Sequence, residues 1–155
     1  MSKVIIIAEA GVNHNGDIQI AKKLIDAAVD AGVDYVKFQT FKADNLVSKS
    51  AKKATYQSVN INDGDDSQYT MLKNLELSHK NHLELMSYCS ERNINFFSTA
   101  FDVEGVKYLN DLGLTFFKIP SGEITNYPYL KAVALCQKPV IMSTGMCSEN
   151  SFLQL

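Results

Sequence analysis

Five short apolar runs in the sequence end on side chains that can do chemistry. The runs cover residues 4–8, 33–38, 94–97, 114–119 and 139–142. The polar residues at or near their ends are Glu9, Lys37, Gln39, Ser98, Thr99, Lys118, Ser121, Glu123, Ser143 and Thr144. Carboxylates, amines and hydroxyls move protons and bind anions. A catalytic or binding site is therefore predicted wherever these run ends meet.

Two lysines carry most of this prediction, because a charge inside an apolar run is costly to bury without a partner. Either Lys37 or Lys118 alone could form a structural ion pair with Glu9 or Glu123. Both lysines together, with hydroxyls and carboxylates beside them, favour an active site that binds a phosphate or a carboxylate. A lysine that ends a strand can also become a Schiff-base nucleophile, so a lysine aldolase stays open as an alternative.

The elements that must position these residues are alternating strands and helices. The apolar runs predict five strands buried on both faces, and the helical spacing between them predicts βα units with a parallel sheet. Asp17, Ser78 and Asp102 are predicted helix N-caps, and Gly32 and Gly113 suit the left-handed residue beyond a helix end. Helices are expected over residues 18–29, 78–92, 103–112 and 128–136. Ligands bind at the carboxyl ends of parallel strands, which is where the polar residues lie.

Three histidines and one long segment are harder to assign. His14 follows the first strand and either serves the site or orders its loop by hydrogen bonds. His79 and His82 lie near the start of a helix and are predicted to be surface residues. The polar segment 42–69 has the length of a lid, a binding loop or a disordered insertion.

Composition limits the function classes. The 155 residues are 46% hydrophobic and 21% charged with a net charge of −2, which predicts one soluble domain without the basic field that nucleic-acid binding needs. The sequence contains no apolar run long enough to span a membrane and no secretory signal pattern, so a cytoplasmic protein without a membrane partner is expected. Its three cysteines show no disulfide or zinc spacing.

The strand-end motifs, taken in order, resemble the N-acylneuraminate (sialic acid) synthase family, which includes N-acetylneuraminate, legionaminate and pseudaminate synthases. The matching stretches are "IIAEAGVNHNGD", "VKFQT", "LELSHKNHLEL", "FFSTAFD", "FFKIPSGEITNYPYL" and "KPVIMSTGM". They cover nearly the whole chain in the family's order, which makes the match specific.

The resemblance implies a (β/α)8 barrel enzyme that condenses phosphoenolpyruvate with an N-acetylated hexosamine-type sugar aldehyde and releases phosphate. It implies a divalent metal, Mn or Mg, and a homodimer for the complete enzyme. The residues that match family positions fall into two groups. The substrate-binding set is Lys37, Gln39, Thr99 and Ser121, with Gln39 near the sugar and the other three around phosphoenolpyruvate. The catalytic set is Lys118 at the phosphoenolpyruvate, Glu9 near the reacting aldehyde, and Glu123 as the carboxylate that orients water or protonates an oxyanion.

Length is the main departure from the family. A complete barrel takes about 250 residues, whereas residues 1–155 supply five βα units, the N-terminal part of such a barrel. The resemblance places two metal-ligating histidines and an antifreeze-like domain beyond this part, so no metal ligand is expected in this chain. Five strands would form an open sheet with two free edges, which favours completion by another chain or association of copies. The alternative to an active synthase is therefore an inactive fragment of one.

Overall fold

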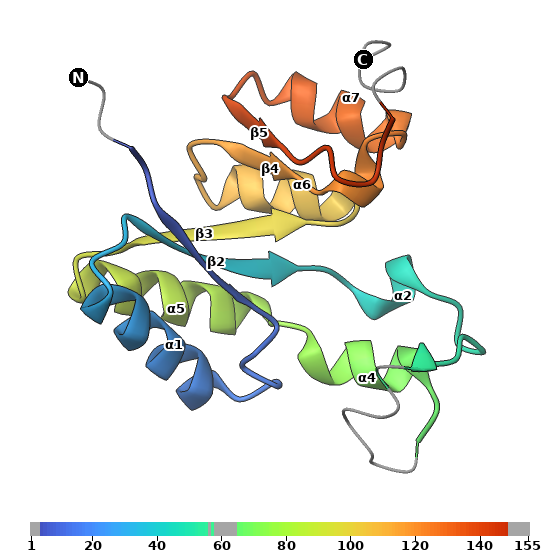
Figure 1. The fold of residues 1–155 in the computed structure, drawn as a ribbon, viewed down its shortest axis with the longest axis horizontal. Helices are drawn as coiled ribbons and strands as arrows, with labels where there is room; N and C mark the ends of the chain where they lie inside the picture. Colours follow the sequence, from blue (N-terminus) through green and yellow to red (C-terminus); the bar gives the residue numbers. More distant parts are fainter. Residues whose placement is uncertain (1–3, 56, 58–64, 149–155) are drawn as a thin grey trace.

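A computed structural model describes residues 4–55, 57 and 65–148 of the chain. Strands and helices alternate along it, as the apolar pattern predicts (Figure 1). The elements in chain order are β1 (Ile7–Gly11), α1 (Ile18–Asp30), β2 (Tyr35–Thr40), α2 (Ala43–Leu46), α4 (Gln68–Leu75), α5 (His79–Glu91), β3 (Asn95–Ala100), α6 (Val103–Asp111), β4 (Phe117–Ile119), the 3-10 helix η1 (Ser121–Glu123), α7 (Tyr127–Leu135) and β5 (Val140–Met142).

All five predicted strands form, but the prediction of one open five-stranded sheet is wrong. β1, β2 and β3 pair in parallel as one sheet, and β4 and β5 pair in parallel as a second. Between β3 and β4, side chains make the connection within the described residues. Phe97 and Phe116 have ring centroids 4.2 Å apart, and the Tyr129 hydroxyl of α7 donates to the Ala100 carbonyl at 3.0 Å. We call this junction the β3–β4 seam.

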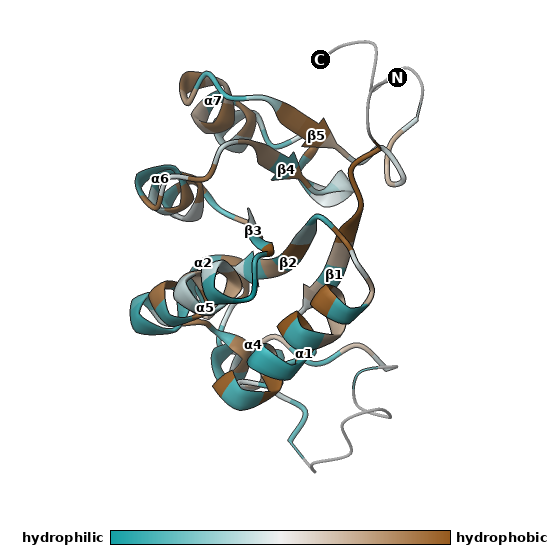
Figure 2. Cartoon of the chain, turned by 90° about the vertical axis from the view of Figure 1, so that its left-hand side faces the viewer, coloured by the Kyte–Doolittle hydropathy of each residue, from teal (hydrophilic) through white to brown (hydrophobic). Residues whose placement is uncertain are grey.

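The outer strands are more exposed than the sequence predicts. Val4, Ile5 and Ile6 are 77%, 61% and 54% exposed, and β1 begins after them, three residues later than expected. In β5, Val140 and Ile141 are 42% and 43% exposed. Figure 2 shows the hydrophobic colouring of both segments. β1 pairs only with β2, and β5 pairs only with β4, so each has one edge without a strand neighbour among the described residues.

The two faces of the three-stranded sheet differ in what covers them. Val36, Phe38 and Thr40 of β2 are buried on one face, which packs against α1 and α5. Tyr35, Lys37 and Gln39 alternate with them and lie on the opposite face, because successive strand residues point to opposite sides. Figure 1 shows α1 and α5 together beneath this sheet, and α6 and α7 beside β4 and β5. We call the face of Lys37 the inner face.

The predicted helix ends are confirmed. The Asp17 side chain accepts hydrogen bonds from the first turn of α1, and Asp102 does the same for α6. Ser78 caps α5 through a reciprocal capping box. Gly32 and Gly113 have φ angles of +68° and +87°, the left-handed conformation that glycine adopts without strain.

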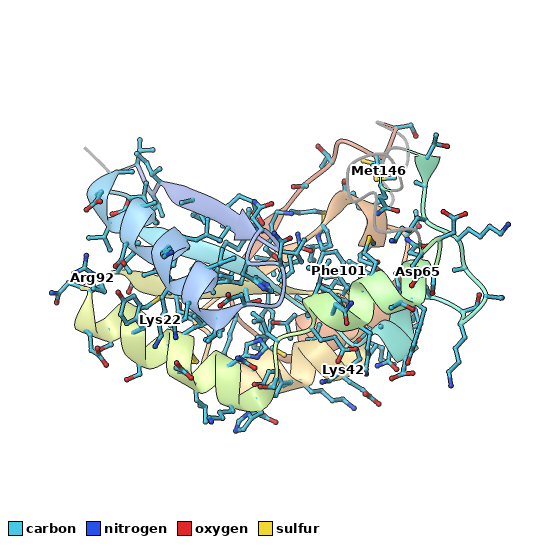
Figure 3. All side chains as sticks on the ribbon, turned by 90° about the horizontal axis from the view of Figure 1, so that it is seen from below. Lys22, Lys42, Asp65, Arg92, Phe101 and Met146 are labelled. Atoms are coloured by element: carbon cyan, nitrogen blue, oxygen red, sulfur yellow. The ribbon has the colours of Figure 1, made fainter. Side chains whose placement is uncertain are left out.

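Ion pairs join α1 to α5 on the outside of the molecule. Lys22 contacts Glu84 at 2.7 Å, and the Arg92 guanidinium contacts Asp26 at 2.9 Å. Figure 3 labels Lys22 and Arg92 along this side. Exposed pairs of this kind contribute little to stability, so apolar packing between the helices holds the layer.

The polar segment 42–69 is partly regular. α2 lies at its start, and an antiparallel bridge joins Lys52 to Ser67. Ser67 caps α4, a helix that the sequence analysis did not predict. Residues 56 and 58–64 of this segment lie outside the described residues. Within the described part of the chain, every helix is too short or too polar to cross a lipid bilayer.

Candidate active site

The inner face begins with an aromatic floor. The ring centroid of Tyr35 lies 6.3 Å from that of Phe97 and 5.3 Å from that of Phe116. Lys37 follows Tyr35 by two residues, and Lys118 follows Phe116 by two residues. Because side chains alternate along a strand, each lysine lies on the same face as its ring. The floor shields one side of both lysines from water, and both side chains are partly buried.

Glu9, Lys37 and Lys118 form a charged cluster above this floor. Glu9 is the register partner of Lys37, and its carboxylate contacts the Lys37 ammonium. The Lys118 ammonium donates to the Ile119 carbonyl at 3.0 Å. Burial lowers the pKa of Lys118, the charge of Lys37 lowers it further, and Glu9 partly offsets both. The structural ion pair considered from the sequence therefore exists for Lys37, whereas Lys118 has a neutral partner.

Gln39 and Thr99 lie side by side at the next level of the inner face. They are register partners in β2 and β3. Thr99 is 3% exposed, and its hydroxyl has no hydrogen-bond partner among the described residues. A buried hydroxyl without a partner is costly and calls for an explanation, of which a missing ligand is one.

Gly11 makes room beside these residues and was not singled out from the sequence. The pairing of β1 with β2 shifts register between Glu9 and Gly11, where the φ angle of Gly11 is +54°. A Cβ at this position would lie 3.2 Å from Glu9 Oε1 and 3.5 Å from Gln39 Nε2. A glycine at a strand end is a known mark of such a bulge, so the signal was present in the sequence.

Ser121 and Glu123 lie in η1, directly after β4 and Lys118. The Glu123 carboxylate accepts a hydrogen bond of 2.6 Å from Asn126 Nδ2. Its charge also helps burial to raise the pKa of the Tyr129 hydroxyl. Glu123 is thus oriented toward the start of α7, at the same strand end as Lys118.

The opposite face of the sheet holds a buried polar chain that corrects two expectations. Ser98, expected to join the site, contacts Thr40 Oγ1 at 2.6 Å, and Thr40 Oγ1 contacts His82 Nε2 at 2.8 Å. His82, predicted to be a surface residue, is 1% exposed, because α5 turns it toward the sheet. His79 is exposed, as predicted.

The tautomer of His82 follows from its neighbours. Its Nδ1 lies 2.9 Å from the Ser78 carbonyl, which can only accept, so Nδ1 carries the hydrogen. The Thr40 hydroxyl then donates to Nε2 and accepts from Ser98. Burial lowers the pKa of His82, which favours this neutral ring. The hydrogen bonds of His82, Thr40 and Ser98 therefore connect α5 to β2 and β3 on the face opposite the inner face.

His14 orders the loop after β1. The Gly16 amide donates to His14 Nδ1 at 3.0 Å, which puts the ring hydrogen on Nε2. The ring is fully buried near Phe38, which faces the helices. Burial lowers the pKa of His14. The Nδ1 contact supports the loop-ordering alternative, whereas the buried Nε2 has no hydrogen-bond partner among the described residues.

A metal site does not form from the described residues. No three histidine, cysteine, aspartate or glutamate side chains come together there as metal ligands. In the charged cluster, Glu9 is the single carboxylate and its neighbours are cations, which repel a divalent ion. These residues do not fit the implied Mn or Mg, and no step below depends on it.

The chain is similar to several known synthases. Residues 24–154 match the NeuB family. It is 57% identical over 148 residues to the N,N'-diacetyllegionaminic acid synthase of Campylobacter jejuni, covering 96% of this chain and 44% of that protein. It is 54% identical to the Legionella pneumophila synthase of the same name, covering 92% of this chain and 40% of that protein. This chain spans less than half the length of these relatives.

Solved structures share the fold. The N-acetylneuraminic acid (sialic acid) synthetase of Leptospira borgpetersenii superposes with a TM-score of 0.81 at 33% identity, covering 99% of this chain and 48% of that one. A spore coat polysaccharide biosynthesis protein of Bacillus subtilis gives 0.75 at 35% identity, with 99% and 39% covered. The parallel βα units are thus an incomplete barrel of this type. With the family match over most of its length, this chain belongs to the NeuB family of sialic acid synthases.

Proposed function

We propose that this chain carries the phosphoenolpyruvate-binding part of an enzyme that condenses phosphoenolpyruvate with an N-acetylated sugar aldehyde, giving a sialic-acid-like nonulosonic acid and phosphate. The observation that carries the proposal is the pair of partly buried lysines, Lys37 and Lys118, beside the unpartnered hydroxyl of Thr99. Phosphoenolpyruvate brings a phosphate and a carboxylate. Two ammonium groups and a hydroxyl donor suit both anionic ends.

The proposed residue roles follow the chemistry of the condensation. The methylene carbon of phosphoenolpyruvate attacks the aldehyde carbon, water adds to the former enol carbon, and the tetrahedral intermediate expels phosphate. Lys37, Lys118, Thr99 and Ser121 would hold the phosphoenolpyruvate. Glu9 and Gln39 would face the sugar and its aldehyde, and Glu123 would orient the water or protonate the oxyanion. The Mn or Mg ion and the homodimer remain predictions for a complete enzyme, as does the cytoplasmic location.

Among the nonulosonic acids we propose N,N'-diacetyllegionaminic acid. The two relatives of that name are 57% and 54% identical to this chain, whereas the N-acetylneuraminate-9-phosphate synthase of Mus musculus is 35% identical. Phosphoenolpyruvate contains no nitrogen and supplies three carbons. The sugar must therefore be a six-carbon aldehyde that already bears both acetamido groups.

Calorimetric titration of the 155-residue chain with phosphoenolpyruvate tests the binding part. The wild-type chain should bind, and Lys37→Ala and Lys118→Ala should each weaken binding at least about tenfold, because each removes a charge-assisted contact. Lys23→Ala is the matched control, since Lys23 is exposed on α1, away from the inner face. Absence of binding, with and without Mn²⁺, would support the inactive-fragment alternative.

The lysine-aldolase alternative keeps one supporting observation, the lowered pKa of Lys118, which a Schiff-base amine needs. Borohydride reduction of the chain with pyruvate or an acetamido sugar, followed by mass spectrometry, tests it. The condensation proposal expects no covalent adduct on either inner lysine. A reduced adduct at Lys118 would favour the aldolase.

A further inference from the structure

The Glu9–Lys37 ion pair is unequally exposed. The Lys37 side chain is 14% exposed, whereas the Glu9 side chain is 52% exposed. Lys37 lies beside Phe97 in the register of β2 and β3, so its ammonium has few other ways to be solvated. The partner that can leave the pair is therefore Glu9, whose carboxylate loses less when it returns to water.

The charged cluster contains two ammonium groups and one carboxylate. Lys118 is near enough to Lys37 for their charges to repel, and its hydrogen-bond acceptor is the neutral Ile119 carbonyl. An anion that binds both lysines would relieve this repulsion. The same anion would meet the negative charge of Glu9 at Lys37, so Glu9 and the anion compete for one ammonium.

We infer that Glu9 is an internal counter-ion of Lys37, which the anionic group of phosphoenolpyruvate displaces on binding. This inference rests on the proposed function. It gives Glu9 two positions, one on Lys37 in the free chain and one away from it in the complex. The wild-type chain therefore binds the anion more weakly than its two lysines would allow.

The surroundings of Glu9 supply the second position. Glu9 Oε1 and Gln39 Nε2 lie 3.2 Å and 3.5 Å from the place that a Cβ of Gly11 would take, so the carboxylate and the amide flank the same point beside Gly11, which puts no side chain between them. The Gln39 amide can donate to a carboxylate that has left Lys37. On displacement, the Glu9 carboxylate thus moves from Lys37 to Gln39, the next residue of β2 on the same face.

Glu9→Gln tests the inference because it removes the charge and keeps the shape. Calorimetric titrations of the wild-type chain and Glu9→Gln with phosphoenolpyruvate, and separately with inorganic phosphate, should show about 3- to 10-fold tighter binding by the variant. That range is of the order that a partly exposed ion pair contributes, which the wild-type chain gives up on binding and the variant does not have. Glu84→Gln is the control, because Glu84 pairs with Lys22 on the helix side and its loss should leave binding unchanged.

A double-mutant cycle ties the effect to Lys37. In a Lys37→Met background, Glu9→Gln should change binding less than twofold, because the ammonium for which Glu9 competes is gone. A measurement on the wild-type chain needs no variant. The carboxyl ¹³C resonance of Glu9 should move at saturating phosphoenolpyruvate, and that of Glu84 should stay.

The outcomes separate the inference from the proposed function. If the wild-type chain binds phosphoenolpyruvate but Glu9→Gln binds equally or more weakly, Glu9 is a ligand or a spectator and the counter-ion inference is overturned, while the proposed function stands. A stationary Glu9 resonance overturns it in the same way. Binding of phosphate by every chain, without preference for phosphoenolpyruvate, counts against the proposed substrate but leaves the counter-ion role supported if Glu9→Gln is tighter.

Discussion

Two threonines of the same sheet should respond oppositely to the same substitution. Thr99 and Thr40 are 3% and 6% exposed, and they lie on opposite faces. The Thr99 hydroxyl has no partner among the described residues, whereas the Thr40 hydroxyl bonds both His82 and Ser98. Valine has the shape of threonine without the hydroxyl. We expect Thr99→Val to preserve or raise stability and Thr40→Val to lower it.

The magnitudes follow from counting unsatisfied groups. Thr99→Val removes one orphaned hydroxyl, which should change the free energy of unfolding by 0 to about +2 kcal/mol. Thr40→Val leaves two buried groups unpaired, His82 Nε2 and the Ser98 hydroxyl, and should cost about 2–4 kcal/mol. If Thr99 binds phosphoenolpyruvate, Thr99→Val should also weaken that binding about 10- to 100-fold, because one hydrogen bond to a charged group is lost.

Urea denaturation and calorimetric titration measure the two effects on the same preparations. Thr40→Val is the matched control for binding, since its hydroxyl faces the helices and its loss should leave the affinity of the folded chain unchanged. The reasoning is wrong if Thr99→Val destabilises the chain as much as Thr40→Val, because the Thr99 hydroxyl would then have a partner. Equal affinities of wild type and Thr99→Val would remove Thr99 from the proposed site.

Four further substitutions probe other parts of the structure. Lys118→Met should be more stable than wild type at neutral pH in urea titrations, because the folded chain has to keep a buried ammonium whose pKa is lowered. The advantage should disappear as the pH rises toward 10.5, the ordinary lysine pKa, since Lys118 is then neutral in the folded chain. A difference in stability that does not change with pH would contradict this. Gly16→Ala should lower the free energy of unfolding by about 3 kcal/mol or more in thermal denaturation, since its Cβ would lie 2.3 Å from the Asn74 carbonyl oxygen. Gly32→Ala, which has a similar φ but open space around its Cβ, should cost about 1–2 kcal/mol. Equal costs would show that the approach of Asn74 to Gly16 does not matter. Asp17→Ala should lower the unfolding free energy by about 1 kcal/mol through loss of the α1 cap, and an unchanged denaturation midpoint would contradict this.

The sequence predicted the elements well because the signals for them are local. Asp17, Ser78 and Asp102 cap their helices through residues two to three positions away, so neighbouring letters contain the whole interaction. The strand assignments depended on apolar runs, which mark burial but not pairing. Val4 lies before β1 instead of in it, and Val140 lies in β5 but is 42% exposed instead of buried. Exposure at these edges depends on whether another strand lies alongside.

The candidate site could be predicted only in part. Strand period places Lys37 and Gln39 on one face, and the alternation also assigns Thr40 to the other. The burial of His82 could not be found in this way, because its partner Thr40 is 42 residues distant in the chain. Likewise, the contact of Glu9 with Lys37 depends on the register of two strands and on the bulge before Gly11, neither of which a single motif contains.

The β3–β4 seam has a consequence for how the molecule opens. Backbone ladders join β1, β2 and β3 to one another and β4 to β5, whereas among the described residues the seam is held by the packing of a shared hydrophobic core and by the Tyr129 hydroxyl. The amide hydrogens of β4 and β5 can therefore exchange with solvent in openings that leave the first three strands protected. Lys118 lies on one side of the seam and Lys37 on the other, so an anion that binds both would join two cooperative units into one.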